Sequence, residues 1–452
     1  MEETEEPEQE KGEKQEINLQ QTSKFINKVM FLFFGIAALL GWNALLTQMD
    51  YFDYFLEDMN PTKTFPFLNF ILNISFQFLL LWKKDLIPLN IELIVGIIGS
   101  IVMLVLIPLS ASLLGINEKI NMTITGGLVV IMGFVNALAS GGFFSYAGHF
   151  PLEMIVIFTV GQGFSAIIMN ILQYIVLVAV NIDDYEKQLI IRGWIFFSIA
   201  IIILIICLIL FLLSYKDEYC IYYLNKAGNT FLSKKDKESK VISLLSDEER
   251  ISDAKEDEIK KDQIQNIDEE EMIEERFTPK FSYIFKKIWD LDLLACYGYV
   301  LTFSLFPYAS ASQKIFDIKE YNFVTIITIY NVFDTFGRYI VKIMSPNKKV
   351  NMIIVLGRSI LLFTIIFNCY CQVNYDINIA YTSIILIINT AILGVTNGIG
   401  ATLTFGLASN SVEDEIKKQT GGSIGFFSIL GIFLGSCAAF GTGAIIDSIL
   451  GK

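Results

Sequence analysis

Long runs of apolar residues, each about 20 residues in length, recur along most of this chain. A run of that length crosses the hydrocarbon core of a bilayer as one helix, and a helix satisfies its own backbone hydrogen bonds there. The runs are continuous, unlike the short alternating segments of a membrane β-barrel. The pattern therefore predicts an all-α polytopic membrane protein with about eleven spans, at approximately 28–49, 65–82, 91–114, 125–147, 153–180, 189–214, 288–310, 322–343, 350–370, 378–406 and 421–448.

Two charged segments interrupt this pattern and divide the chain into four parts. We expect an acidic cytosolic tail at 1–24, a bundle of six helices at 25–214, a charged cytosolic loop at 215–285 and a bundle of five helices at 286–452. Because the loop carries dense mixed charge and few apolar residues, it cannot bury a core and is expected to be a disordered tether. A regulatory role for the loop is the alternative.

The basic residues predict the orientation, because cytosolic loops of membrane proteins are enriched in Lys and Arg. Most of them fall on the side of the 215–285 loop, namely Lys24, Lys28, Lys83, Lys84, Lys342, Lys348, Lys349, Lys417 and Lys418. We therefore expect a cytosolic N-terminus, and an odd number of spans then places the C-terminus on the other side. The plasma membrane is the expected bilayer, with an intracellular membrane as the alternative.

Composition narrows the class of function. Charged residues make up 18% of the chain and the mean hydropathy is +0.53, whereas a soluble domain carries about 25% charged residues. The net charge of −13 lies mostly in the tail and the loop, and no basic face favours a nucleic-acid polymer as partner. The single His149 and the six cysteines follow no metal or disulfide spacing, so we expect no metal site and no cofactor.

Ionisable residues inside the spans are the candidate functional groups. A charge near the bilayer centre costs about 2.5–3.5 kcal/mol on insertion scales, so such residues usually face the protein interior and often mark a substrate path. Asp334 and Arg338 are four apart and share one helix face with Asn331. Arg358 lies in the next span. The residues themselves leave two interpretations open, an ion pair that only neutralises itself or a polar face that binds a solute.

Trp42 and Asn43 interrupt the first span and form a second candidate site. A tryptophan in a helix often serves packing or anchors the span at the interface. Followed by a buried amide, it is also able to stack on a flat ring such as a nucleobase, a contact worth about 1–3 kcal/mol.

Glycines repeat at four-residue spacing in the last two predicted spans. Gly394 and Gly398 form one pair, and two further pairs follow in the last span. Small residues at this spacing let two helix backbones approach closely, so we expect tight helix packing there.

Other classes of membrane protein fit less well. About eleven spans, with their charges concentrated in the second half, do not favour a receptor, and no repeated filter or charged ring favours a channel. An enzyme would need a paired catalytic constellation, and Asp334 has no evident partner carboxylate. We therefore expect a transporter and no catalytic activity.

Short motifs in these spans resemble those of the equilibrative nucleoside transporter family. The resemblance runs in order along the chain and rests on Gly41-Trp42-Asn43, Gly161-Gln162-Gly163, Phe306-Pro307, Asn331 with Asp334, Gly337 and Arg338, Gly357-Arg358, and Thr396-Asn397-Gly398. It implies a fold similar to the major facilitator type, with a bundle of six and a bundle of five helices around a central cavity.

The resemblance also implies a function and a site. It implies passage of nucleosides, sometimes nucleobases, by alternating access, with Asp334 and Arg338 contacting the solute and Trp42 lining the cavity. We expect purines among the solutes. A proton-coupled carrier of the same or another polar solute is the alternative. Two departures leave the preferred solute open, because Gly41 replaces a proline and Ser140 stands where many relatives carry a glutamine that binds the base. The candidate substrate-binding residues are Trp42, Asn43, Ser140, Asn331, Asp334, Arg338 and Arg358.

Overall fold

A computed structural model of the chain describes residues 24–83, 87–112, 118–180, 182–226, 281–315, 322–375, 377–413 and 416–451. The expected acidic tail, apart from Lys24, and residues 227–280 of the expected loop lie outside this part. At its edges, the 215–285 segment contains helix α10 (Glu218–Lys226), and its last five residues belong to α13.

The secondary structure of the described residues is helical. The first group of helices comprises α2 (Phe25–Thr47), α3 (Met49–Phe55), η1 (Glu57–Met59), α4 (Pro61–Trp82), α5 (Leu89–Ala111), α6 (Glu118–Asn136), η2 (Ala137–Gly141), α7 (Gly142–Gly148), α8 (Leu152–Ala179) and α9 (Tyr185–Ser214). The second group comprises α13 (Phe281–Leu305), α14 (Tyr308–Ala311), α15 (Asn322–Ile340), η3 (Val341–Ile343), α16 (Lys348–Gly357), α17 (Ile360–Asn374), α18 (Ile379–Asn410) and α19 (Lys417–Leu450).

Ten helical stretches of the described chain have the length and apolar composition needed to cross a membrane. They match ten of the predicted spans. The remaining predicted span is α15. It is 19 residues long, but it is less apolar because it carries the buried residues Asp334 and Arg338. It lies between α8 and α18. The prediction of an all-α polytopic membrane protein is confirmed.

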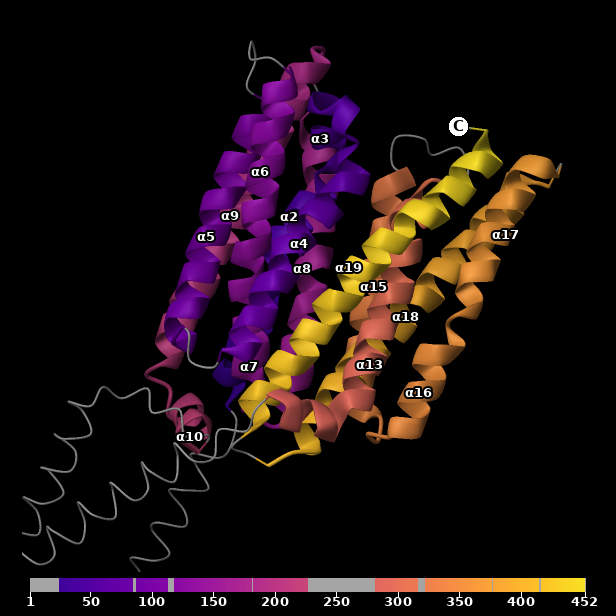
Figure 1. Cartoon of the computed structure of the whole chain (residues 1–452). Coiled ribbons are helices and arrows are strands. Elements are labelled where there is room, and N and C mark those ends of the chain that lie inside the picture. The colour runs from indigo at the N-terminus through magenta and orange to yellow at the C-terminus, as the bar shows by residue number, and fades with distance from the viewer. Residues whose placement is uncertain are drawn as a thin grey trace, which may run out of the picture.

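The helices form two bundles that lean against each other (Figure 1). The main contacts between the bundles run from α15 and α18 to α8 and from α19 to α4 and α7. The start of α2 lies at the same end as α10, since the Asn27 Nδ2 donates to Asp217 Oδ1 at 2.6 Å, and the C-terminus lies at the opposite end (Figure 1). The two termini of the described chain therefore lie at opposite ends of the bundles.

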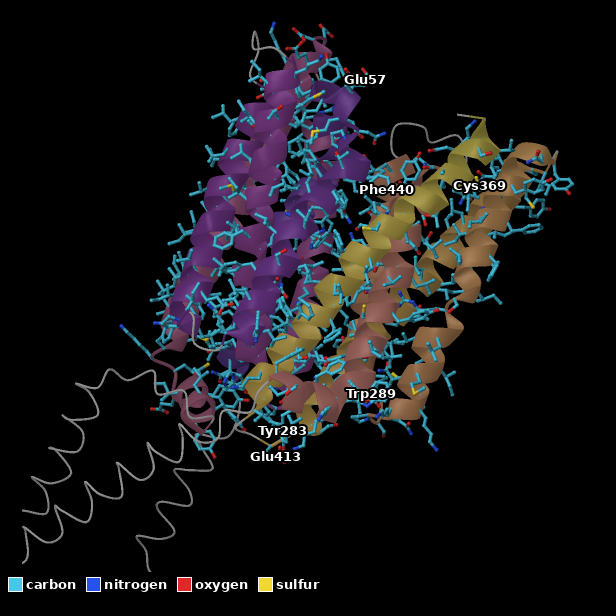
Figure 2. All side chains as sticks on the ribbon, in the orientation of Figure 1. Glu57, Tyr283, Trp289, Cys369, Glu413 and Phe440 are labelled. Atoms are coloured by element: carbon cyan, nitrogen blue, oxygen red, sulfur yellow. The ribbon has the colours of Figure 1, made fainter. Side chains whose placement is uncertain are left out.

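Many large apolar side chains are exposed on the outside of the bundles, where carbon-rich side chains project from the ribbons in Figure 2. Ile353, Phe363 and Phe367 expose 72%, 71% and 65% of their surface. Polar groups such as Asn170 and Asp292 are instead fully buried. An apolar exterior around a polar interior is stable when hydrocarbon covers the outside, and it would be a liability in water.

The glycine pairs let helices pack closely, as the sequence predicts. A Cβ added at Gly398 would meet the backbone oxygen of Asp334 on α15, and a Cβ at Gly394 would lie 2.6 Å from Tyr330 O. On α19, a Cβ at Gly435 would lie 2.7 Å from Val300 O of α13. These positions accept only glycine without a shift of the backbone, so the prediction of tight packing is confirmed.

Two predicted spans are interrupted inside the membrane. The span at 125–147 contains the π-helical turn η2, and the span at 350–370 breaks at Arg358–Ser359, between α16 and α17. Such interruptions are uncommon in helices and are often found at functional positions. Here they position Ser140 and Arg358, two of the candidate residues.

Candidate functional site

A buried ion pair forms the centre of the polar interior. Asp334 and Arg338 are one turn apart on α15, and the Arg338 Nε donates to Asp334 Oδ2 at 2.7 Å. Each of these two residues is 5% exposed. The face predicted from their four-residue spacing is thus directed into the protein.

Arg338 also connects the two bundles. Its Nη1 donates to Gln162 Oε1 at 2.9 Å and to the backbone oxygen of Thr159 at 3.2 Å, and both acceptors belong to α8. Gly163 lets α8 and α15 come this close, because a Cβ there would meet Thr335 of α15, and Gly161 lets α8 approach α2 in the same way. A single guanidinium therefore bonds a carboxylate of its own helix and an amide of the other bundle.

The network continues from Asp334 to Arg358 through an asparagine. Asn397 on α18 donates through Nδ2 to Asp334 Oδ1 at 2.7 Å, and its Oδ1 accepts from Thr302 Oγ1 at 2.8 Å and from Arg358 at 3.3 Å. Arg358 also donates to Thr302 Oγ1 and, at 2.6 Å, to Gly298 O. The network holds one carboxylate and two guanidinium groups, and therefore one uncompensated positive charge.

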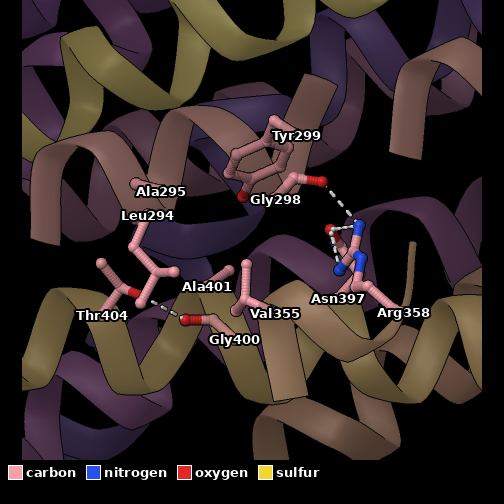
Figure 3. Close-up of a pocket in the computed structure, with 10 residues that line it drawn as sticks. All are labelled: Leu294, Ala295, Gly298, Tyr299, Val355, Arg358, Asn397, Gly400, Ala401 and Thr404. Atoms are coloured by element: carbon pink, nitrogen blue, oxygen red, sulfur yellow. Dashed lines mark hydrogen bonds between the residues drawn. The ribbon is translucent and has the colours of Figure 1, made fainter. Parts of the chain in front are cut away.

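A small pocket lies beside Arg358 (Figure 3). It is partly open, with about 200 Å³ of empty space between α13, α16 and α18, and Tyr299, Val355, Asn397 and Thr404 help to line it. The Arg358 guanidinium bonds Asn397 and Gly298 on one side of this pocket (Figure 3). Neither Asp334 nor Trp42 lines it.

A second pocket, of about 380 Å³, lies between the bundles near the end where the chain terminates. Thr62 and Pro66 of α4 line one side, and aromatic residues at the end of α13 and on α19, including Phe303 and Phe440, line the other. Its aromatic wall continues inward, because Phe303 packs edge-on against Phe70 with ring centroids 6.4 Å apart.

Trp42 lies at the inner end of this aromatic series. Its ring meets Phe70 of α4 edge-on, at a centroid distance of 5.2 Å, and it is 7% exposed. The next residue, Asn43, donates through Nδ2 to Ser165 Oγ of α8 at 2.5 Å. These two candidates thus lie on α2 and contact the first bundle, whereas the ion pair lies on the second.

Ser140 and Asn331 lie outside the network. Ser140 is buried on η2, where its hydroxyl donates to Asn136 O at 2.6 Å and accepts from Gln77 Nε2 at 3.2 Å. Asn331 is half-buried on α15, and its backbone oxygen accepts from Thr335. The structure therefore brings together Asp334, Arg338 and Arg358, but it does not add Ser140 or Asn331 to this network.

Sequence reasoning missed the residues that join the charges, namely Gln162, Asn397, Thr159 and Thr302. Gln162 and Asn397 were visible as amides inside apolar runs and within the quoted motifs. Their partners depend on how helices far apart in the sequence pack together. Among the described residues, no group of three or more His, Cys, Asp or Glu side chains is placed to hold a metal ion.

Comparison with known proteins identifies the family. A family described as Nucleoside transporter matches residues 126–442. Relatives include equilibrative nucleotide transporter 1 of Arabidopsis thaliana, 21% identical over 91% of this chain and 85% of its own length. Equilibrative nucleoside transporter 2 of Rattus norvegicus is 24% identical over 91% of this chain and 95% of its own length.

Solved structures show the same fold. The major facilitator proton:xylose symporter XylE, bound to 6-bromo-6-deoxy-D-glucose, superposes with a TM-score of 0.60 at 13% identity, covering 94% of each chain. A partially occluded inward-open conformation of XylE from E. coli gives 0.55 at 11% identity, covering 94% of this chain and 99% of that one. The predicted major-facilitator-like arrangement and the predicted family resemblance are both confirmed. The chain is a multi-pass membrane transporter, and it belongs to the nucleoside transporter family.

Proposed function

We propose that this chain carries nucleosides or nucleobases across a membrane by alternating access, without coupling to an ion gradient. The relatives at 21% and 24% identity are named equilibrative transporters of nucleotides or nucleosides. The observation that carries the proposal is the position of the Asp334–Arg338 pair. It is buried where the two bundles meet, and it bonds across to α8.

The chemistry of this position suits a neutral polar solute. The pair combines an anionic acceptor with a cationic donor, which are able to bind the hydroxyl, carbonyl and amino groups of a nucleoside. Trp42, on the other bundle, supplies an aromatic face for the base. In this proposal Asp334, Arg338 and Trp42 contact the solute, and Arg358 orients Asp334 through Asn397. Asn43, Ser140 and Asn331 are proposed as the outer part of the same site.

Alternating access requires the bonds between the bundles to exchange. The Arg338 bonds to Gln162 and Thr159 join the bundles in this conformation. Rocking of one bundle against the other would break these bonds, and the solute or water would then supply new acceptors. We further propose that the end carrying α10 faces the cytosol and that the C-terminus lies outside, in the plasma membrane.

Uptake of labelled solutes tests the proposal. Cells that lack nucleoside transport would express the chain and receive radiolabelled adenosine, uridine or hypoxanthine at two external pH values. We expect saturable uptake that stops at equal internal and external concentration and that is the same at both pH values. Accumulation that depends on external pH would favour the proton-coupled alternative. Absence of uptake by protein that has reached the cell surface would overturn the proposal.

A further inference from the structure

Only one of the two polar atoms of the Gln162 side-chain amide has a hydrogen-bond partner among the described residues. Its side chain is 3% exposed on α8, and its Oε1 accepts from the Arg338 Nη1 at 2.9 Å. Within the described part of the chain, its Nε2 is buried and has no hydrogen-bond partner. An amide N–H left without a partner in a buried position costs about 1–3 kcal/mol, so such groups are rare in native proteins.

Arg338 fixes the direction of this amide. A guanidinium group only donates, so it must face the oxygen of Gln162, and a flipped amide would bring two donors together. The Nε2 is therefore held pointing away from Arg338. Gly161 and Gly163, on either side, sit so close to α2 and α15 that a Cβ on either would meet a neighbouring helix. The free donor is thus held on a rigid backbone at the junction of the two bundles.

Several polar atoms nearby already have partners. Each oxygen of Asp334 accepts one bond, from Arg338 or from Asn397. The Arg338 Nη1 donates twice to α8. The Gln162 Nε2 carries N–H groups, which recognise a hydrogen-bond acceptor such as a carbonyl oxygen, a ring nitrogen or a hydroxyl oxygen.

We infer that Gln162 is a specificity-determining residue, whose Nε2 donates to an acceptor atom of the transported solute while Arg338 holds its Oε1. The inference rests on the proposed function, and it names a polar group of the first bundle that recognises the solute. It also explains why an orphaned donor is kept in the protein interior, since the solute completes its hydrogen bonding.

Uptake of solutes that lack one acceptor each tests this inference. The variants are Gln162→Met, which removes the amide, and Gln162→Glu, which keeps the oxygen that Arg338 bonds. Gln173→Met is the matched control, because Gln173 is also buried on α8 but bonds Gln48 and Asp50 instead. The solutes are uridine with its 2′-, 3′- and 5′-deoxy analogues, and inosine with its analogue that lacks the 6-oxo group. Surface abundance is measured for every variant.

We expect the wild type to bind one analogue with about 3- to 10-fold lower apparent affinity than the parent solute, which is the loss expected for one hydrogen bond. In both Gln162 variants the apparent affinity for the parent solute should fall by the same factor. The analogue should then bind as well as its parent. The penalties for the other analogues should not change, and Gln173→Met should keep the wild-type preferences.

Two results would overturn the inference. If both Gln162 variants keep every wild-type penalty, or lose only maximal rate, Gln162 acts only as a link between the bundles. If both are absent from the surface while Gln173→Met is present, Gln162 serves assembly alone. A wild type that reaches the surface but transports none of these solutes counts against the proposed function instead, so the two failures are distinguishable.

Discussion

Replacement of Asp334 by Asn should destabilise the protein more than replacement of Arg338 by Gln. Asp334 is the one carboxylate in a network with two guanidinium groups, those of Arg338 and Arg358. The change Asp334→Asn leaves two buried cations without a counter-charge. The change Arg338→Gln leaves Asp334 bonded to Asn397 and compensated by Arg358, so the charges of the network balance.

Hydrogen bonding increases the difference. If the new Asn turns its oxygen to Arg338, its amide nitrogen faces the Nδ2 of Asn397, and two donors meet. Asn397 is not free to flip, because its Oδ1 accepts from Thr302 at 2.8 Å and from Arg358. Removal of one partner of a buried ion pair costs about 3–5 kcal/mol. An orphaned neutral acceptor, as expected for Arg338→Gln, costs about 1–3 kcal/mol. The difference of about 2 kcal/mol corresponds to about a 30-fold difference in the ratio of folded to unfolded protein.

Surface abundance and thermal unfolding in detergent measure the order of stability of the variants, and uptake measures their function separately. We expect Asp334→Asn to be the less stable single variant. The double variant should lie between the singles in stability, because only Arg358 then stays uncompensated. All three should lose uptake if the pair binds the solute. Equal stability of the two single variants would refute the charge argument, and normal uptake by the double variant would refute the binding role.

Three further predictions concern separate positions. Trp42→Phe should keep a lower KM for uptake than Trp42→Ala, because an aromatic face remains beside Phe70, and equal kinetics in both would remove Trp42 from the site. Gly398→Ala should lower surface abundance, because its methyl group would meet the backbone of α15, whereas Gly441→Ala, with open space around it, should not. Cys220, which lies outside the spans, should react slowly with maleimide in the folded protein and quickly in denaturant. Burial, and to a smaller extent the Asp217 carboxylate, raises the pKa of its thiol well above the ordinary value. Rapid labelling of folded protein would contradict this.

Much of the fold was predictable because membrane insertion acts on local sequence. An apolar run of about 20 residues predicts a span wherever it occurs, and small residues at four-residue spacing predict close helix packing. The helix breaks were not predictable in this way. The π turn at Ala137–Gly141 and the break at Arg358 lie within apolar runs that look continuous, since the packing of neighbouring helices decides where the backbone departs from regular geometry.

The centre of the site was predictable only in part. The four-residue spacing of Asp334 and Arg338 predicts their shared face, because both lie on one helix. The partners of Arg338 lie about 180 positions earlier in the chain, on Thr159 and Gln162. No local pattern specifies such pairings. They follow from the contact of α15 with α8, which depends on the packing of both bundles.

The bond from Arg338 to Gln162 relates recognition to movement in the proposed cycle. A hydrogen bond to a charged group is worth about 1.5–3 kcal/mol net, enough to favour one arrangement of the bundles but not to fix it. When the bundles separate at this position, Arg338 loses its acceptors on α8 and must find others. A solute that supplies an oxygen replaces the lost bond, whereas an empty carrier has to rely on water. A solute shifts the equilibrium between the two arrangements only to the extent that it bonds one better than the other. The group that joins the bundles is, in this proposal, also one that the solute contacts, so binding and reorientation draw on the same few hydrogen bonds.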